Sequence, residues 1–348
     1  MMKTMKKKIF KGLRTILGII LGIFIIDLTM NNLVNTDITD LSRIDKAVID
    51  EYEKLQESDE KLWEDYKLRD KDIIVINKKF LGNTYLFSKD SSIKSIFAKK
   101  INNQNDKVNI YRITKFHPKK LQFAIGNFNE KDKNYKILGK DNIFYVKYDE
   151  DSIDKKFSSY HFLPFLSHEA LHYYMQKDWD NLTFRGYAYN DKELELLDEE
   201  YKVLSKIKNA IENKSDNDEL LTLGNEYLKV MDERFEKTDK EKIDSEIFEE
   251  TMEGAANYVS IKASQIIGYD YGILYFDNTK DVDFADIVPT IKKGAVDQSI
   301  LGEKIVYESG ALLCKYLDAI GDKNWQEKLN IKGKTDISLY SIIKENLK

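Results

Sequence analysis

Strand-like and helix-like patterns occupy different parts of this chain, and this separation constrains its fold more than any other feature. Short runs of β-branched and aromatic residues, divided by clusters of Asn, Asp, Gly and Lys, fill residues 71–150. From about residue 155 onward, apolar residues recur at helical spacing instead. A strand block followed by a helix block predicts an α+β fold. We expect a mixed, mainly antiparallel sheet packed on the helix at 160–178, followed by a mostly helical C-terminal lobe.

The composition limits the class of protein. The 348 residues are 42% hydrophobic and 33% charged, with a formal net charge of −5. This charge, without a basic aromatic stripe beyond residue 30, argues against a nucleic-acid partner. The single cysteine, Cys314, excludes an internal disulfide, and its apolar neighbours predict a buried, inert thiol.

The N-terminus has the layout of a signal sequence. Six basic residues and no acid lie within residues 1–14, and an apolar run follows at 16–26. A basic segment before an apolar segment is typical of a signal sequence. We predict that residues 1–30 form an uncleaved signal-anchor, with a cleaved signal peptide as the alternative. The basic flank predicts a cytoplasmic N-terminus and an extracytoplasmic remainder, which would be secreted if cleavage occurs.

One motif carries recognisable chemistry. Residues 168–172 read His-Glu-x-x-His within a predicted helix. Positions four apart share a helix face, so His168 and His172 can bind one metal ion, and imidazole is a common zinc ligand. Glu169 projects beside them, where it can act as a base on water without being a ligand. The motif predicts one Zn²⁺ per chain.

A third protein ligand is expected from an acidic helix downstream. Three acids, Glu249, Glu250 and Glu253, stand in a helical segment with small residues at 254–256 that would allow another helix to approach closely. A buried acid among small residues is unfavourable unless it meets a cation. Asn257, one turn after Glu253, is predicted to orient a metal-bound histidine.

These segments resemble the gluzincin clan of zinc peptidases. The resemblance rests on His-Glu-x-x-His, on Glu-Gly-x-Ala-x-Tyr beginning at Glu253, and on Tyr-x-x-Gly-Ala beginning at Tyr307, in this order. It implies that Glu253 is the third zinc ligand, with Glu249 and Glu250 as fallback ligands. It also implies that the hydroxyl of Tyr307 stabilises an oxyanion.

The resemblance to the aminopeptidase branch of the clan is incomplete. A longer interval than usual separates His172 from Glu253, and the segment 126–130 does not match the Gly-x-Met-Glu-Asn strand that recognises a free amino terminus in that branch.

The patterns divide the chain into four parts. Residues 1–30 are the signal segment, and 31–70 a helical stalk or packing helix. A β-rich subdomain at 71–155 precedes a helical catalytic lobe at 156–348, which contains a charged helical insert at about 188–240. We expect the strand at 143–148 to be a sheet edge that pairs with an extended substrate.

The sequence thus predicts a zinc metallopeptidase that hydrolyses peptide bonds with metal-activated water, on the outer side of a membrane. Its partners would be a peptide or protein substrate and the membrane. The alternatives are an inactive peptidase-fold binding or scaffold protein tethered to the membrane, and a helical domain with a structural zinc or none. Frequent Lys, Asn and Ile are typical of an AT-rich bacterial genome.

Overall fold

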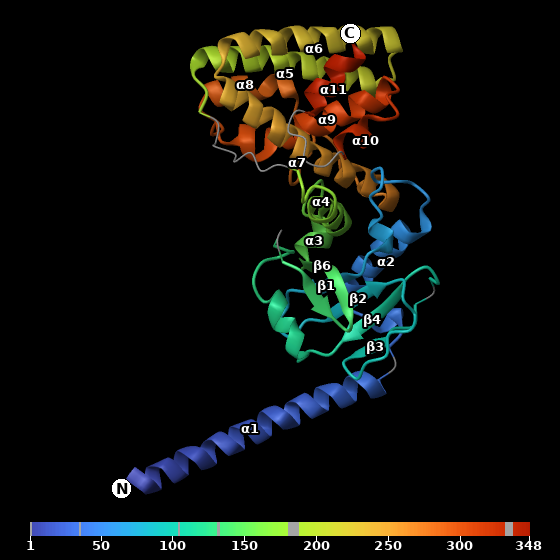
Figure 1. The fold of residues 1–348 in the computed structure, drawn as a ribbon, viewed down its shortest axis with the longest axis vertical. Helices are drawn as coiled ribbons and strands as arrows, with labels where there is room; N and C mark the ends of the chain where they lie inside the picture. Colours follow the sequence, from blue (N-terminus) through green and yellow to red (C-terminus); the bar gives the residue numbers. More distant parts are fainter. Residues whose placement is uncertain (1, 35, 104, 131–132, 180–187, 331–336) are drawn as a thin grey trace. The chain divides into compact units, whose positions relative to one another are not determined.

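The chain folds into two compact units. The computed structural model describes residues 2–34, 36–103, 105–130, 133–179, 188–330 and 337–348. The first unit comprises residues 1–57 and 67–153, and the second comprises 58–66 and 154–348. We call them the sheet unit and the helical unit. The α+β fold predicted from the sequence is confirmed: a mixed sheet lies in the N-terminal half and the C-terminal part is helical (Figure 1).

The sheet unit contains every named strand of the described residues. Its helices are α1 (Met2–Leu33), η1 (Ile38–Asp40), α2 (Arg43–Glu57), η2 (Leu68–Asp70) and η3 (Pro118–Phe123), with α3 (Asp151–Asp154) at its end. Its strands are β1 (Ile73–Asn77), β2 (Thr84–Ser88), β3 (Ala98–Lys100), β4 (Asn109–Ile113), β5 (Tyr135–Ile137) and β6 (Lys140–Tyr148).

The strands form one sheet in the order β3-β4-β2-β1-β6-β5. Among the named strands of the described residues, β1 and β6 pair in parallel and the other neighbours are antiparallel. The prediction that residues 143–148 form a free edge is wrong. One side of β6 pairs with β1, and the other side meets β5 and a bridge from Phe128 to Val146.

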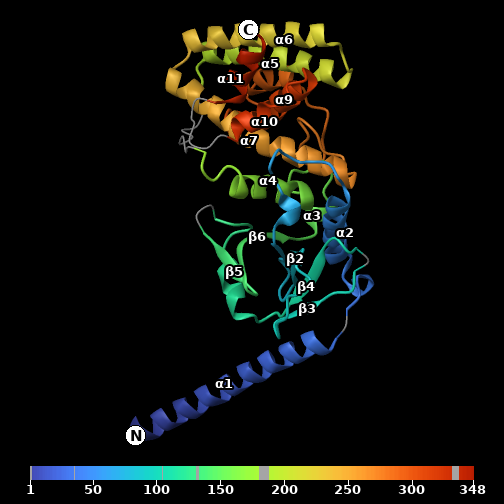
Figure 2. The ribbon, with the colours of Figure 1, turned by 45° about the vertical axis from the view of Figure 1, so that its right-hand side comes forward.

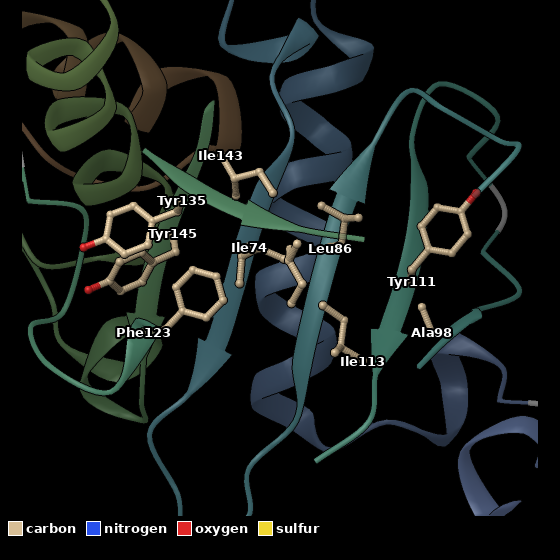
Figure 3. Packing of buried hydrophobic residues seen from close by; sticks show 10 residues of the cluster. Ile74, Leu86, Ala98, Tyr111, Ile113, Phe123, Tyr135, Ile143 and Tyr145 are labelled. Carbon is tan, nitrogen blue, oxygen red and sulfur yellow. The ribbon is translucent and has the colours of Figure 1, made fainter. Parts of the chain in front are cut away.

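The two faces of the sheet bury different groups. On one face, α2 packs through contacts such as that between the rings of Tyr52 and Phe87, whose centroids are 4.5 Å apart. On the other face, the sheet curls around a cluster that includes Ile74, Leu86 and Tyr145 (Figure 3). Successive side chains of a strand point to opposite faces of the sheet, so each strand contributes residues to both faces.

The helix α1 extends from the sheet unit. Its segment Phe10–Leu33 is the one candidate among the described residues that is long and apolar enough to cross a membrane, and it is not buried within the protein.

The helical unit is built around α7 (Lys240–Ile267). Its other elements are α4 (Phe162–Tyr174), α5 (Asp191–Glu212), α6 (Asn217–Lys237), α8 (Phe284–Lys292), η4 (Leu301–Ile305), α9 (Val306–Ala319), α10 (Trp325–Leu329) and α11 (Leu339–Asn346). The closest helix contacts of the unit are those of α7 with α9 and with α4. The left-handed Gly268 ends α7.

The charged segment at 188–240 forms the hairpin of α5 and α6, which lie side by side (Figure 2). Asn190 caps α5 together with Glu193, and Asp216 caps α6. The hairpin is an integral layer of the unit, since α5 packs on α8 and α9 while α6 contacts α7 and α9. Buried Arg234 of α6 binds Glu200 of α5 and Glu246 of α7, which ties the hairpin to the central helix.

Residues 58–66 belong to the helical unit although they follow α2. Trp63 packs edge-on against Trp325 and Tyr258, and its indole nitrogen donates to Asn330 Oδ1 at 2.8 Å. The region 31–70, predicted as one helical segment, is therefore divided between α2 and this irregular segment, which contains bends and turns. The predicted contact of the sheet with the helix at 160–178 involves both units and stays a prediction.

Candidate metal centre

The helix α4 carries the His-Glu-x-x-His motif. Pro164 lies in its first turn, where amide groups have no acceptor within the helix, so its lack of an amide hydrogen does not weaken the helix. Leu163, Leu166 and Ala170 are buried and fix the rotation of the helix. This rotation brings the imidazoles of His168 and His172 together, with their ring centroids 4.8 Å apart.

The helix α7 brings Glu253 to the two histidines. It crosses α9 at Gly254 and Gly310, where backbone meets backbone: a Cβ at Gly254 would overlap Gly310, and one at Gly310 would overlap the carbonyl of Glu250. The small residues at 254–256 therefore do allow the close helix approach that the sequence suggested. Glu253, directly before this crossing, faces α4.

Three potential ligand atoms converge on one point. The Nε2 atoms of His168 and His172 are 3.1 Å apart, and Oε2 of Glu253 lies 3.3 Å from the first and 3.2 Å from the second. Ligands at about 2.0–2.1 Å from a tetrahedral zinc ion stand about 3.3–3.4 Å from one another. The triangle therefore has the dimensions of three zinc ligands, and this donor set fits the metal.

The side chains of the triangle are nearly but not fully enclosed. Those of His168, His172 and Glu253 retain 13%, 24% and 12% of their exposure. A site of three ligands that still reaches solvent leaves a position for water or substrate, as catalytic zinc sites do. Among the described residues, this is the one group of three His, Cys, Asp or Glu side chains with metal-binding geometry.

The electrostatics show a strongly coupled pair. Burial alone would lower the pKa of His172, but the Glu253 carboxylate raises it to about 9. Burial would likewise raise the pKa of Glu253, but His172 and His168 hold it well below its usual range. In the metal-free protein these shifts favour a protonated His172 beside an ionised Glu253.

Gln176 is a functional candidate that the sequence reasoning missed. Its Oε1 accepts a hydrogen bond from Nδ1 of His172, and its Nε2 donates to the carbonyl of Met252 at 2.9 Å. The first bond leaves Nε2 of His172 to face the centre, and the second ties α4 to the residue before Glu253. The spacing of four residues from His172 was a signal that could have identified it.

Glu169 and Tyr307 flank the triangle. Burial raises the pKa of Glu169, partly offset by His168 and His172. The ring of Tyr307 lies nearly parallel to that of His168, with centroids 6.0 Å apart. Burial, followed by the charges of Glu253, Glu249 and Glu169, holds the Tyr307 pKa far above its usual range, so its hydroxyl stays protonated.

The two fallback ligands have different surroundings. Glu249 is near the centre: burial and the Glu253 charge raise its pKa to about 7, while His172 opposes the shift. Glu250 is buried elsewhere: burial and the charge of Glu200 raise its pKa, and a hydrogen bond with Ser309 opposes the shift. Neither belongs to the triangle.

The role predicted for Asn257 is wrong. Its amide nitrogen lies 3.3 Å from the carbonyl of Tyr307 and 3.2 Å from Glu308 Oε1, and its oxygen accepts from the hydroxyl of Tyr271 at 2.9 Å. Asn257 therefore fixes the start of α9, and with it Tyr307, instead of orienting a histidine. Gln176 makes the histidine contact because it lies four residues after His172, just beyond the end of α4.

The remaining histidines, His117 and His161, are not members of the triangle. His117 is buried; its ring packs on Phe97 and its Nδ1 accepts from the amide of Lys119. His161 precedes α4 and stacks on Tyr269, with ring centroids 3.7 Å apart. Cys314 is buried as expected, and burial raises the pKa of its thiol.

Comparison with protein-family models, with curated proteins and with solved structures finds no match to this chain.

Proposed function

We propose that the protein is a zinc-dependent peptidase whose helical unit hydrolyses peptide bonds outside the membrane to which α1 anchors the chain. The observation that carries this proposal is the triangle of His168, His172 and Glu253, whose ligand atoms are spaced as in a zinc site. Glu169 lies beside it. The resemblance of the three motifs to the gluzincin clan supports the same reaction class.

The three ligands would hold the ion between α4 and α7. When bound, zinc supplies Lewis acidity that polarises a carbonyl and acidifies water. Gln176 keeps the His172 ring in the orientation that the ion requires.

Glu169 would handle the proton. It accepts a proton from the attacking water and returns it to the amine that leaves when the C–N bond breaks. Burial raises its pKa, which favours holding the proton between these two transfers. Tyr307 stays protonated at neutral pH and can donate its hydrogen to the carbonyl oxygen as negative charge develops there.

The N-terminal helix supports the proposed location. Phe10–Leu33 is long enough to span a bilayer, and the lysines before it favour a cytoplasmic N-terminus. Both folded units would then lie outside the membrane. An extracytoplasmic peptidase of this kind would act on peptides or proteins at the cell surface.

The test combines zinc analysis with turnover. The full-length chain in detergent should bind one zinc and cleave members of a peptide library. Glu169→Gln should keep the zinc and lower the rate by about 10²–10⁴-fold. His172→Ala should lose both, and Glu195→Gln, at an exposed position of α5, should change neither.

Each alternative has its own result. Bound zinc without cleavage of any peptide would favour a membrane-tethered binding or scaffold protein. Unfolding on chelation, again without cleavage, would indicate a structural zinc. Full activity in Glu169→Gln would contradict the proposed mechanism even if zinc is bound.

A further inference from the structure

The last turns of α1 pack against the sheet unit. The rings of Phe24 and Phe97 are 6.2 Å apart. Oδ2 of Asp27 accepts from the amide of Phe116 at 3.1 Å, and Asn32 donates to the carbonyl of Ile96 at 2.7 Å. Two segments of the sheet unit, 94–97 and 114–117, are therefore held directly beside the helix.

The position of these contacts along α1 matters. The hydrocarbon core of a bilayer takes up about 20 helical residues. Counted from Phe10 or from Leu13, such a span ends at about residue 29 or about residue 32. Phe24 and Asp27 therefore lie in the outer part of the hydrocarbon, roughly two to eight residues before the span ends, and the segments that contact them reach the same depth.

Large apolar side chains stand exposed on and next to these segments. Ile96 is 63% exposed, Phe116 42%, Leu121 82% and Ile125 81%. Leu121 lies in η3 and Ile125 just after it, and Lys120 of η3 is near enough to Asp27 of α1 for their charges to interact. Ile96 and Phe116 are among the residues that contact α1 directly, and large apolar side chains exposed at such a place favour a contact with another phase or molecule.

The charge around these side chains is positive. Residues 91–101 and 107–129 contain no Asp or Glu, although the chain as a whole has a net charge of −5. Three of the lysines in these segments, Lys94, Lys115 and Lys119, are exposed. Surfaces that bind anionic membranes typically combine exposed apolar side chains with lysines.

We propose that Ile96, Phe116, Leu121 and Ile125 form a membrane-contact surface that inserts into the outer leaflet of the bilayer that α1 crosses, with the lysines on anionic phosphate headgroups. The inference rests on the proposed membrane span. Its occupant is the lipid because the surface is continuous with α1 and its charge is complementary to anionic headgroups. The sheet unit then contacts the membrane surface directly, in addition to being connected to α1.

Single-cysteine labelling tests this directly. Cys314 is buried, so a fluorophore that senses polarity will label an introduced cysteine selectively. The full chain is reconstituted in vesicles of phosphatidylcholine and phosphatidylglycerol, with or without brominated lipid as a quencher. The labelled positions are Leu121→Cys, Ile125→Cys, Ile19→Cys on α1, and Ser91→Cys. Ser91 is exposed beyond β2, at the opposite end of the strands from Thr114, because Ser88 pairs with Asn109 and Thr84 with Ile113.

The expected result is a blue shift and loss of emission by brominated lipid at positions 19, 121 and 125, with neither at position 91. The double change Lys115→Glu and Lys119→Glu should reduce quenching at position 121 in anionic vesicles. Quenching at position 19 but not at 121 or 125 would overturn the inference while leaving the anchor intact. No quenching at position 19 would refute the anchor itself.

A blue shift at position 121 that depends on protein concentration and is insensitive to brominated lipid would assign the surface to a second copy of the chain. That result would also overturn the inference.

Discussion

Two buried carboxylates, Asp45 of the sheet unit and Glu253 of the helical unit, have similar electrostatics and different chemistry. Burial would raise both pKa values, yet both lie below their ordinary range. Asp45 is held by Tyr148, Asn77, Asn83 and Tyr85, whose polar hydrogens it accepts over 2.7–3.0 Å. These donors saturate its oxygens and fix α2 to the sheet.

Glu253 faces imidazoles instead. A neutral imidazole can turn a lone pair toward the point at which the carboxylate oxygen also aims, whereas an amide nitrogen or a tyrosine hydroxyl offers hydrogens there. Convergent donors around an acid make a structural anchor. Convergent acceptors leave a place that only a cation or a shared proton can occupy, and the pKa of the acid alone does not distinguish the two cases.

The largest effect is expected at Asp45, the carboxylate that fixes α2 to the sheet. Asp45→Ala leaves three buried donors and the half-buried Asn83 without their acceptor, and should lower the free energy of unfolding of the sheet unit by roughly 3–5 kcal/mol. Asp141→Ala, at an exposed position of β6, is the matched control. Urea unfolding monitored by circular dichroism measures both. Equal effects of the two changes would show that Asp45 is not an anchor.

The second prediction concerns Glu253. Glu253→Gln keeps the shape of the side chain but replaces the charged ligand, and should weaken zinc binding by at least about 100-fold. Glu249→Gln, one turn earlier, should leave zinc affinity nearly unchanged. Competition with a chromogenic chelator measures the two affinities. The reverse order would transfer the third ligand to Glu249.

A smaller effect is expected at Gln176. Gln176→Ala removes the partner of His172 Nδ1, and should weaken zinc binding by about 10–100-fold without changing the ligand set. Gln265→Ala, at an exposed position of α7, serves as the control. Unchanged affinity in Gln176→Ala would limit this residue to a role in helix packing.

The dependence of stability on pH also distinguishes the surroundings of the two carboxylates. In the metal-free protein, the His172 pKa of about 9 lies above its ordinary value of 6.5. The stability from this shift is complete below pH 6.5 and is lost as the pH rises through about 9. Asp45 behaves oppositely: its contribution is present above its ordinary pKa of 3.8 and is lost in acid.

Zinc affinity provides a readout for the same proton. Because zinc must displace it from His172, affinity should rise about tenfold per pH unit up to about pH 9. Titrations in buffers of different pH, and proton release on zinc addition, measure this. A pH-independent affinity between pH 7 and 9 would show that no proton is shared at the triangle.

The sequence predicted features that depend on local spacing. Helical periodicity places His168 and His172 on one face, and the small residues after Glu253 by themselves indicated a close helix crossing. The division into strands and helices followed from composition and period alone.

Features that depend on partners distant in the chain were not predictable. Asn257 binds groups on α9 and on the loop at Tyr271, so its own helix did not reveal its role. The position of β6 inside the sheet depends on its parallel pairing with β1, which no local pattern encodes. The burial of His117 depends in the same way on its contact with Phe97.

The crossing at Gly254 and Gly310 has an evolutionary consequence. Because the backbones of α7 and α9 touch there, neither glycine can acquire a side chain unless the helices separate, and a compensating change at the other glycine cannot create room. Glu253 and Tyr307 each stand within three residues of one of these glycines. The two positions should therefore be inherited as a block, and a search for relatives of this chain should require both glycines at these offsets in addition to the histidine motif.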